Sequence, residues 1–241
     1  MKFTIKSEKP ATVKSGCVIL GVFEHRKLSP AAAQFDKSTG GLLKKLLQKG
    51  DMDGKCGQTL ILHYPAGANC ERVLLAGCGK PEEFNSRAFN KVIAGVTRAV
   101  NQSGATDAVS YLGELDVTDR DSYGKVRSIA EITCSSLYTP DQLKSKKDKN
   151  THPLRRMAIN MASDESRIAR KALKDGSAIA DGVELARTLG DLPGNPFSSG
   201  AHDVSADGSV IVGFGNSNSV LKAFIWDADL GRKRVMYLGE D

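Results

Sequence analysis

Five short apolar runs lie between stretches of helical periodicity, and this alternation restricts the fold more than any other feature. The runs cover residues 17–23, 59–62, 72–75, 108–112 and 157–161. A continuous apolar run is typical of a strand buried on both faces, as in parallel sheets. We therefore predict an α/β fold, a three-layer sandwich with a mixed, mostly parallel sheet. Turn-forming residues around Gly67 join the second and third runs, which predicts one antiparallel hairpin.

Several stretches between these runs have the periodicity of amphipathic helices. Apolar residues at helical spacing predict helices over residues 30–35, 42–47, 86–100 and 126–137. The pair Ser29-Pro30 is a typical start for the first of these helices, since serine caps a helix and proline fits its first turn. The third helix is the clearest, because Phe89, Val92 and Val96 line one side.

The longest helical stretch follows the last apolar run and ends in a turn rich in proline. Its apolar residues recur at spacings of three, four and seven, which predicts an amphipathic helix with one stripe of Ile168, Ala172, Ile179, Val183 and Ala186. Arg187 lies near the predicted end and Gly190 just past it, where a cation and a glycine help to close a helix. The residues LPGNP at 192–196 exclude regular structure. We interpret the helix and turn as a connector between globular units.

The composition changes after residue 199, where helical periodicity stops. Short apolar runs at 210–212, 223–226 and 235–238 are separated by turn-forming glycine, asparagine and aspartate. A single unit of about 40 residues buries its apolar face poorly, so we expect a marginal three-stranded meander or a poorly ordered tail. The predicted organisation is an α/β domain over residues 1–163, a connector over 164–199 and a short β-rich tail over 200–241.

Five blocks in the first 199 residues resemble, in order, the amino-terminal part of the leucyl (cytosol) aminopeptidase family. These blocks are CVILGVFEHRKLSPAAAQFD, GGLLKKLLQKGDMDGKCGQTLILH, RVLLAGCGK, YTPDQLKSKKDKN and DGVELARTLGDLPGNP. The resemblance implies a non-catalytic, macro-domain-like domain followed by the helix that leads into a catalytic half. In the full-length family, that half removes N-terminal amino acids from peptides with two divalent metals, Mn²⁺ or Zn²⁺.

The resemblance stops at Ser199, before the family's catalytic blocks. The glycine-rich block around a Lys-Gly pair and the block NTDAEGR do not occur in this sequence. We therefore assign no catalytic residue, no metal ligand and no cofactor, and we expect a truncated or fused member that is inactive alone. A peptide is a substrate only if a catalytic domain is supplied elsewhere. The tail, with VSADGSVIVGFGNSN and AFIWDADLG, resembles one HAF-type repeat of bacterial surface and extracellular proteins.

A basic segment suggests an alternative function. The net charge is +6, and the candidate DNA or phosphate contacts are Lys144, Lys146, Lys147, Lys149, Arg155 and Arg156. Further cations follow at Arg167, Arg170, Lys171 and Lys174. The resemblance implies DNA binding, because some bacterial members bind DNA with help from these domains; the simpler interpretation is a solvated loop and outer helix face. The macro-like fold implies a third option, a nucleotide or ADP-ribose at the carboxyl ends of the strands.

The remaining candidate sites have simpler explanations. The segment GCGK at 77–80 lacks the pattern of a phosphate-binding loop and predicts a strand-to-helix turn, while Cys78 within it has no evident base that would make it reactive. Residues 119–124 imitate a calcium loop without its bidentate acid, so they predict a helix cap. The four histidines are far apart in the sequence and do not form a metal-binding motif.

The sequence also gives expectations for partners and location. No run approaches the roughly 18 apolar residues of a membrane span, so we expect no membrane partner. The five widely spaced cysteines are typical of reduced thiols, which indicates a cytoplasmic protein. We expect the apolar stripe of the connector helix, without its usual neighbour, to promote self-association.

Overall fold

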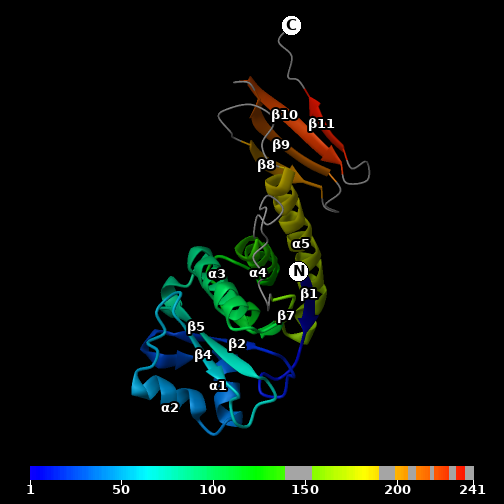
Figure 1. Ribbon diagram of the computed structural model, residues 1–241. Helices are drawn as coiled ribbons and strands as arrows, with labels where there is room; N and C mark the ends of the chain where they lie inside the picture. Colours follow the sequence, from blue (N-terminus) through cyan, green and yellow to red (C-terminus); the bar gives the residue numbers. More distant parts are fainter. Residues whose placement is uncertain (139–153, 190–198, 206–209, 218–219, 228–231, 237–241) are drawn as a thin grey trace. The chain divides into compact units, whose positions relative to one another are not determined.

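The computed structural model describes residues 1–138, 154–189, 199–205, 210–217, 220–227 and 232–236 (Figure 1). The chain divides into two compact units. The first comprises Met1–Leu137 and Lys149–Leu173, and the second comprises the rest of the chain. The first unit contains a seven-stranded sheet and the second a four-stranded sheet.

The sheet of the first unit has the strand order β1-β7-β6-β2-β5-β4, and a short strand β3 pairs with β2. The bounds are β1 Lys2–Lys6, β2 Val18–Phe23, β3 Lys27–Leu28, β4 Thr59–His63, β5 Arg72–Gly79, β6 Asp107–Ser110 and β7 Arg156–Asn160. Neighbouring strands from β1 to β5 run parallel, whereas β4 is antiparallel to β5 and β3 to β2. The predicted mixed, mostly parallel sheet and the predicted hairpin of β4 and β5 are therefore confirmed, and β3 adds a second antiparallel pair that was not predicted.

The central strands lie where the apolar runs predict them, but β1 is absent from the predicted strands. Every residue of β2 is buried, and so is every residue of β5 after Arg72. In β1, Phe3 and Ile5 alternate with polar residues, which is typical of an edge strand. Lys2 pairs with Arg156 of β7, so β1 is held by residues that are distant in the sequence.

Helices cover both faces of the sheet (Figure 1). Their bounds are α1 Pro30–Ser38, α2 Leu42–Lys49, α3 Ser86–Gln102, α4 Ser122–Leu137 and α5 Ser166–Leu189, with 3₁₀ turns η1 Glu24–Arg26, η2 Pro81–Glu83, η3 Leu112–Glu114 and η5 Ser163–Glu165. Phe35 of α1 and Leu47 of α2 belong to one core cluster. Phe89 of α3 and Ile129 of α4 belong to another, together with Ala172 of α5. These two cores on opposite faces confirm the three-layer sandwich.

Three helices of the first unit begin at residues whose side chains accept hydrogen bonds from backbone N–H groups of the first turn. Ser29 Oγ accepts a hydrogen bond from the Ala32 N–H at 3.3 Å, as predicted for the start of α1. Asn85 Oδ1 accepts hydrogen bonds from the N–H groups of Arg87 and Ala88, both at 3.1 Å, and so caps α3. Asp121 Oδ1 accepts from the Gly124 N–H at 2.7 Å, which confirms the predicted helix cap in the segment 119–124.

The buried face of α5 differs from the predicted stripe. Within the stripe, Ala172 is completely buried and Ile179 is half-buried, but Ile168 is 51% exposed and Val183 is 36% exposed. Ala169, which is not part of the stripe, is also completely buried. The predicted stripe is therefore buried only in part, and the buried face extends to Ala169 beside it; the side chain of Ala186 lies outside the described residues. The helix packs through small residues, which allow its backbone to approach the core closely, and its larger apolar side chains lie at the border of that face. Gly190 and the proline-rich turn after it lie outside the described residues.

The second unit contains four antiparallel strands in the order β11-β10-β9-β8. They are β8 Ser199–Val204, β9 Val210–Ser217, β10 Val220–Asp227 and β11 Arg232–Met236. The predicted apolar runs overlap β9, β10 and β11, whereas β8 is a fourth strand, so the expected three-stranded meander is wrong in this respect. β8 contains no apolar run because only its last residue, Val204, is a large apolar residue. Residues 237–238 of the third run lie outside the described residues.

Candidate functional site

The carboxyl edge of the parallel strands is the usual position of a ligand site in a sheet of this type. The chain leaves β2 toward α1 on one face, and it leaves β5 and β6 toward α3 and α4 on the other. This reversal puts the topological switch point beside β2, where a nucleotide or ADP-ribose would be expected to bind. The contacts of the residues around that point determine whether a ligand has room to bind there.

A loop of the chain packs against the carboxyl ends of β2 and β5, which are paired as far as Phe23 and Gly79. The Gly79 N–H donates to Gly54 O and the Gly57 N–H donates to Gly77 O, each at 2.9 Å. A Cβ atom on Gly54 would lie 2.2 Å from Phe23 O, and one on Gly77 would lie 2.1 Å from Lys55 O. The glycines thus permit direct backbone contact, and the loop fills the place that a ligand would take. Gly77 and Gly79 are the last residues of β5 rather than the predicted strand-to-helix turn.

The space on the other side of β2 is filled by the segment that follows β6. A Cβ atom on Gly21 would lie 3.0 Å from Leu115 Cδ1, and one on Gly113 would lie 2.6 Å from Met161 Sδ. Lys125 is only 8% exposed, and its Nζ donates to Leu115 O at 3.0 Å. These contacts argue against a nucleotide at the described part of this edge.

Farther along the same edge, a polar cluster connects β1 with β6 and β7. The Glu8 N–H donates to Asn160 Oδ1 at 2.9 Å, and Asn160 Nδ2 donates to Glu114 Oε1 at 2.7 Å. The Tyr111 hydroxyl donates to Glu8 O at 2.9 Å. Burial raises the pKa of both Tyr111 and Glu114. Since these groups bind one another, the cluster holds the amino-terminal segment against the sheet.

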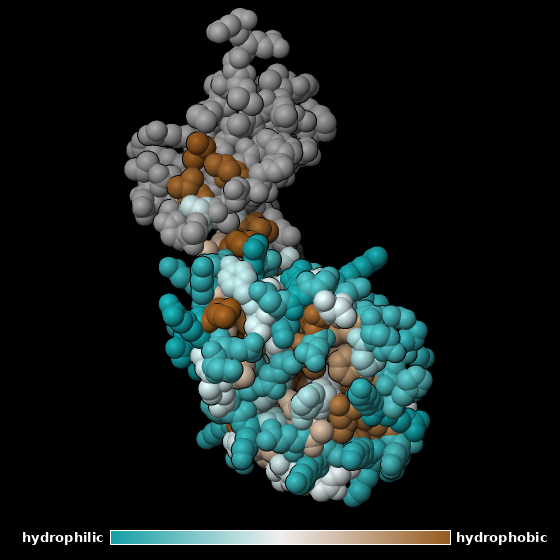
Figure 2. Space-filling model, turned by 180° about the vertical axis from the view of Figure 1, so that it is seen from behind, coloured by the Kyte–Doolittle hydropathy of each residue, from teal (hydrophilic) through white to brown (hydrophobic). Residues whose placement is uncertain are grey.

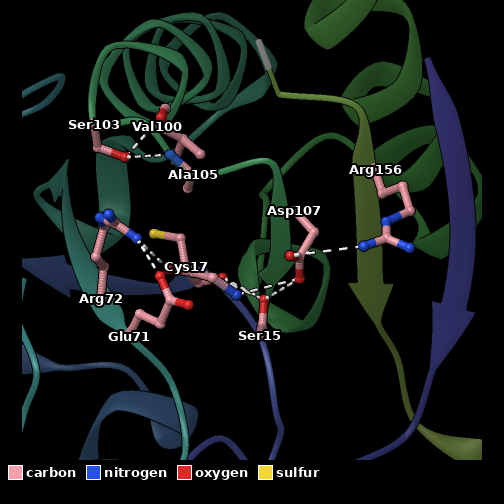
Figure 3. A network of polar contacts seen from close by, with 10 residues as sticks. Ser15, Cys17, Glu71, Arg72, Val100, Ser103, Ala105, Asp107 and Arg156 are labelled. Atoms are coloured by element: carbon pink, nitrogen blue, oxygen red, sulfur yellow. Dashed lines mark hydrogen bonds and ion pairs between the residues drawn. The ribbon is translucent and has the colours of Figure 1, made fainter. Parts of the chain in front are cut away.

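A second polar network lies at the amino edge of the strands (Figure 3). Asp107 at the start of β6 accepts hydrogen bonds from the Ser15 hydroxyl at 3.0 Å and the Gly16 N–H at 3.2 Å, both at Oδ2. Its other oxygen lies 4.0 Å from Nη2 of Arg156 at the start of β7. Asp107 therefore connects the beginnings of three parallel strands through one carboxylate.

Arg72 lies in the same region, at the start of β5 (Figure 3). Its Nη1 donates to Glu71 Oε2 at 2.7 Å and to Gly16 O at 3.4 Å. The carboxylate of Glu71 already neutralises this guanidinium, so Arg72 does not offer an anion site. Burial raises the pKa of the nearby Cys17 thiol to about 12, and that of Cys78 likewise to about 12, so neither is a nucleophile at neutral pH.

The structure describes only part of the predicted basic segment. Lys144, Lys146, Lys147 and Lys149 lie outside the described residues, whereas Arg155 and Arg156 are exposed. In α5, exposed cations recur at spacings of three, four and seven: Arg167, Arg170, Lys171 and Lys174. They lie opposite the buried face that contains Ala169 and Ala172, so they form a basic stripe on the outer side of the helix. Arg156 begins β7 and α5 follows its end, so these two groups of cations start from opposite ends of that strand.

The described residues contain no group of three histidine, cysteine, aspartate or glutamate side chains that could hold a metal ion. Sequence reasoning missed Asp107, Ser15 and Glu114, because these polar residues become neighbours of other groups only in the folded sheet.

The face of the first unit shown in Figure 2 is largely hydrophilic, with apolar side chains in small separate areas. None of the described helices has the length and apolar character to cross a membrane.

Comparison with known proteins identifies the family. Residues 19–147 match the sequence model described as the cytosol aminopeptidase family, N-terminal domain. The chain belongs to the cytosol aminopeptidase family. A probable cytosol aminopeptidase of Thioalkalivibrio sulfidiphilus (strain HL-EbGR7) is 46% identical over 196 residues, which are 81% of this chain and 40% of that protein. One of Vibrio campbellii (strain ATCC BAA-1116) is 43% identical over 196 residues, 81% of this chain and 39% of that protein.

The chain thus spans about 40% of the length of the curated relatives that it matches. Among solved structures, a tomato leucine aminopeptidase mutant aligns with a TM-score of 0.60 and 17% identity, over 93% of this chain and 50% of that chain. The bottromycin maturation enzyme BotP aligns with a TM-score of 0.53 and 18% identity, over 80% of this chain and 40% of that chain. At these identities the likeness shows a shared fold.

Proposed function

We propose that this chain is a non-catalytic scaffold of a metal-dependent aminopeptidase and does not hydrolyse peptides by itself. The observation that carries this proposal is the position of the match, which covers the family's N-terminal domain and about 40% of the relatives' length. The described residues also lack a cluster of three metal-binding side chains. Two-metal hydrolysis needs such ligands to hold the ions and to activate a water molecule.

An aminopeptidase assay tests this proposal directly. The purified chain is incubated with leucyl-p-nitroanilide and Mn²⁺ or Zn²⁺, and the intact Thioalkalivibrio relative is the positive control. We expect release of p-nitroaniline by the relative and no release above a blank by this chain. Metal-dependent turnover that co-purifies with this chain and disappears with a chelator would contradict the proposal.

A mixing experiment tests the scaffold role. The part of the Thioalkalivibrio relative that this chain does not match is expressed separately and assayed with and without this chain. If the chain is a competent scaffold, the mixture is more active or more heat-resistant than the separate fragment. No change in either property would mean that the two pieces do not associate.

DNA binding is a second candidate function, and the outer stripe of α5 favours it. Arg167, Arg170 and Lys171 are exposed on one helix face, where cations can contact successive phosphates. Duplex DNA should bind at about 50 mM salt and dissociate as salt increases, because binding releases counterions. A gel-shift titration that shows no complex at low salt would exclude this function.

A charge-matched pair of variants locates the DNA contact. The triple variant Arg167→Gln, Arg170→Gln, Lys171→Gln removes three cations from α5. The control Lys44→Gln, Lys45→Gln, Lys49→Gln removes three exposed cations from α2. We expect the salt-dependence slope to fall by roughly 2 to 3 in the α5 variant and to change little in the control. Equal losses in both variants would indicate only a general effect of net charge.

We also propose a cytoplasmic location, in agreement with the names of the relatives.

A further inference from the structure

The strand β4 ends the strand order of the first unit, so within the described part of the chain one side of it has no neighbouring strand. Its hydrogen bonds to β5 determine which groups face outward. The Gly77 N–H donates to Gln58 O and the Tyr64 N–H donates to Glu71 O, each at 2.7 Å. With Leu60 opposite Leu75 in the register, the even-numbered residues exchange hydrogen bonds with β5. The N–H and C=O groups of Thr59, Ile61 and His63 therefore point away from β5.

This edge lacks the features that usually prevent strands from pairing between molecules. The sequence of β4 is TLILH, with no lysine, arginine, acid or proline, and its three central residues are only half-buried. The opposite edge strand, β1, carries Lys2 and Lys6. Charged residues at an edge discourage pairing between molecules, because they would lie opposite one another or lose water. Pairing β1 with itself around Thr4 would bring Lys2 against Lys6 of the partner subunit, whereas β4 brings no like charges together.

The strand β4 is also complementary to itself. In an antiparallel pair centred on Ile61, Ile61 faces Ile61 of the partner subunit, and Thr59 faces His63 of the partner subunit. All of these residues carry outward N–H and C=O groups, so this register joins donors to acceptors along the whole strand. Leu60 then faces Leu62 of the partner subunit on the same side of the sheet. Since Leu60 and Leu62 both pack against one core and Ile61 against the other, the register preserves both faces.

The ends of β4 limit the pairing to this register. Tyr64 follows the strand with a left-handed φ of 49°, and Gly57 before it has a φ of 87°. These turns leave three outward-facing residues. A shift of two residues in either direction would leave one of them unpaired on each chain, so the centred register gives the most hydrogen bonds.

We propose that β4 is a dimerisation edge, at which a second copy of this chain adds its own β4 in antiparallel orientation around a two-fold axis at Ile61. The pairing is isologous, because the same residues contribute from both subunits. A strand-to-strand contact is a small interface, so the dimer is weak and depends on protein concentration.

The test measures association of the full chain by sedimentation equilibrium from about 10 μM to about 1 mM, the range in which small interfaces associate. Hydrogen exchange at both ends of this range locates the contact. We expect the amides of Thr59, Ile61 and His63 to exchange several-fold more slowly at high concentration, while those of Leu60 and Leu62 stay unchanged. A monomer throughout the range, or exchange rates at β4 that do not depend on concentration, would overturn the proposal.

Matched variants separate this edge from other surfaces. Ile61→Lys places two like charges at the two-fold axis, and Ile5→Lys makes the same change at a half-buried position of the opposite edge strand, in contact with the same core. We expect the first variant to remain monomeric and the second to dimerise as the unmodified chain does. If Ile61→Lys does not fold, His63→Pro removes an outward N–H without removing a bond to β5 and should also weaken the dimer. Association that survives both changes, or protection that appears around Ile168 of α5 instead, would refute the assignment.

Discussion

The contact between the loop at residues 53–57 and the end of β5 leads to a quantitative prediction for Gly77→Ala. The added methyl group would lie 2.1 Å from Lys55 O and 3.0 Å from Gly54 C, so the backbone of the loop must move. The displacement strains or breaks the hydrogen bonds from Gly77 N–H to Gln58 O, from Gly57 N–H to Gly77 O and from Gly79 N–H to Gly54 O, which are 2.7, 2.9 and 2.9 Å long. At about 1 kcal/mol net for each bond, the free energy of unfolding should fall by about 2–4 kcal/mol.

Gly95→Ala is the matched control for this prediction. A Cβ atom on Gly95 would lie 3.6 Å from Gly57 O, which is an ordinary contact, and the residue lies inside α3. Alanine is favoured over glycine within a helix, so this variant should be more stable by about 0.5–1 kcal/mol. The two changes add the same methyl group at two contacts of one loop, and their effects on stability are expected to have opposite signs.

The assay must report on the first unit. The single tryptophan, Trp226, lies in β10 of the second unit, so its fluorescence does not follow the α/β sheet. Hydrogen exchange of the β2 amides in increasing urea measures the stability of the sheet itself. A change of less than about 0.5 kcal/mol in Gly77→Ala is the scale of an ordinary surface substitution. It would mean that the loop moves aside at little cost and does not close the carboxyl edge of the sheet.

Three further predictions follow from the polar and thiol groups. Asp107→Ala should lower the free energy of unfolding, measured by urea denaturation, by about 2–3 kcal/mol, because the Ser15 hydroxyl and the Gly16 N–H lose a charged acceptor. A loss of stability no larger than that of Ser15→Ala would contradict this. Iodoacetamide at pH 8 should modify Cys56 before Cys17 and Cys78, because the pKa of about 12 of the latter two leaves a thiolate fraction of about 10⁻⁴ in each. Peptide mass spectrometry that finds Cys17 modified first would refute this order. Hydrogen bonding to Ser86 holds the pKa of Asp119 below its usual value. The ionised Asp119 therefore stabilises the fold fully above the unfolded pKa of about 3.9, and this stabilisation is lost as pH falls through the lower folded pKa. Asp119→Asn should remove that part of the pH dependence of the melting temperature, and an unchanged pH dependence would contradict this.

The strands and helices that sequence reasoning predicted are those whose own residues determine their burial. β2, and β5 after Arg72, have no charged residue because both of their faces are covered, and α3 has a complete stripe from Phe89 to Val100. β1 has a fainter pattern of two apolar residues, and it is a strand because β7 lies beside it. The buried face of α5 was predicted only in part. Ala172 of the stripe is buried, but so is Ala169 beside it, because a small residue can be buried where a helix packs closely.

The polar sites depend even more on contacts between distant residues. Asp107 accepts from Ser15 and Gly16, which are 92 and 91 residues away, so no local pattern indicates the contact. The closure of the carboxyl edge depends likewise on how closely Gly54 approaches Phe23 O, and glycine in sequence marks only a candidate turn. The fold class could be predicted from periodicity because periodicity records burial. Distances between backbone atoms of different loops are not recorded in it.

The closed carboxyl edge has a consequence for the role of this unit. In a sheet of this architecture the crevice beyond the strand ends is the position at which small molecules are usually held. Here Gly54 and Gly77 bring a loop into that position on one side of β2, and Leu115 and Met161 fill the other. Among the described residues, the outward groups of β4 and the basic stripe of α5 remain accessible on the surface. We propose that both features contact other macromolecules, as a scaffold domain requires.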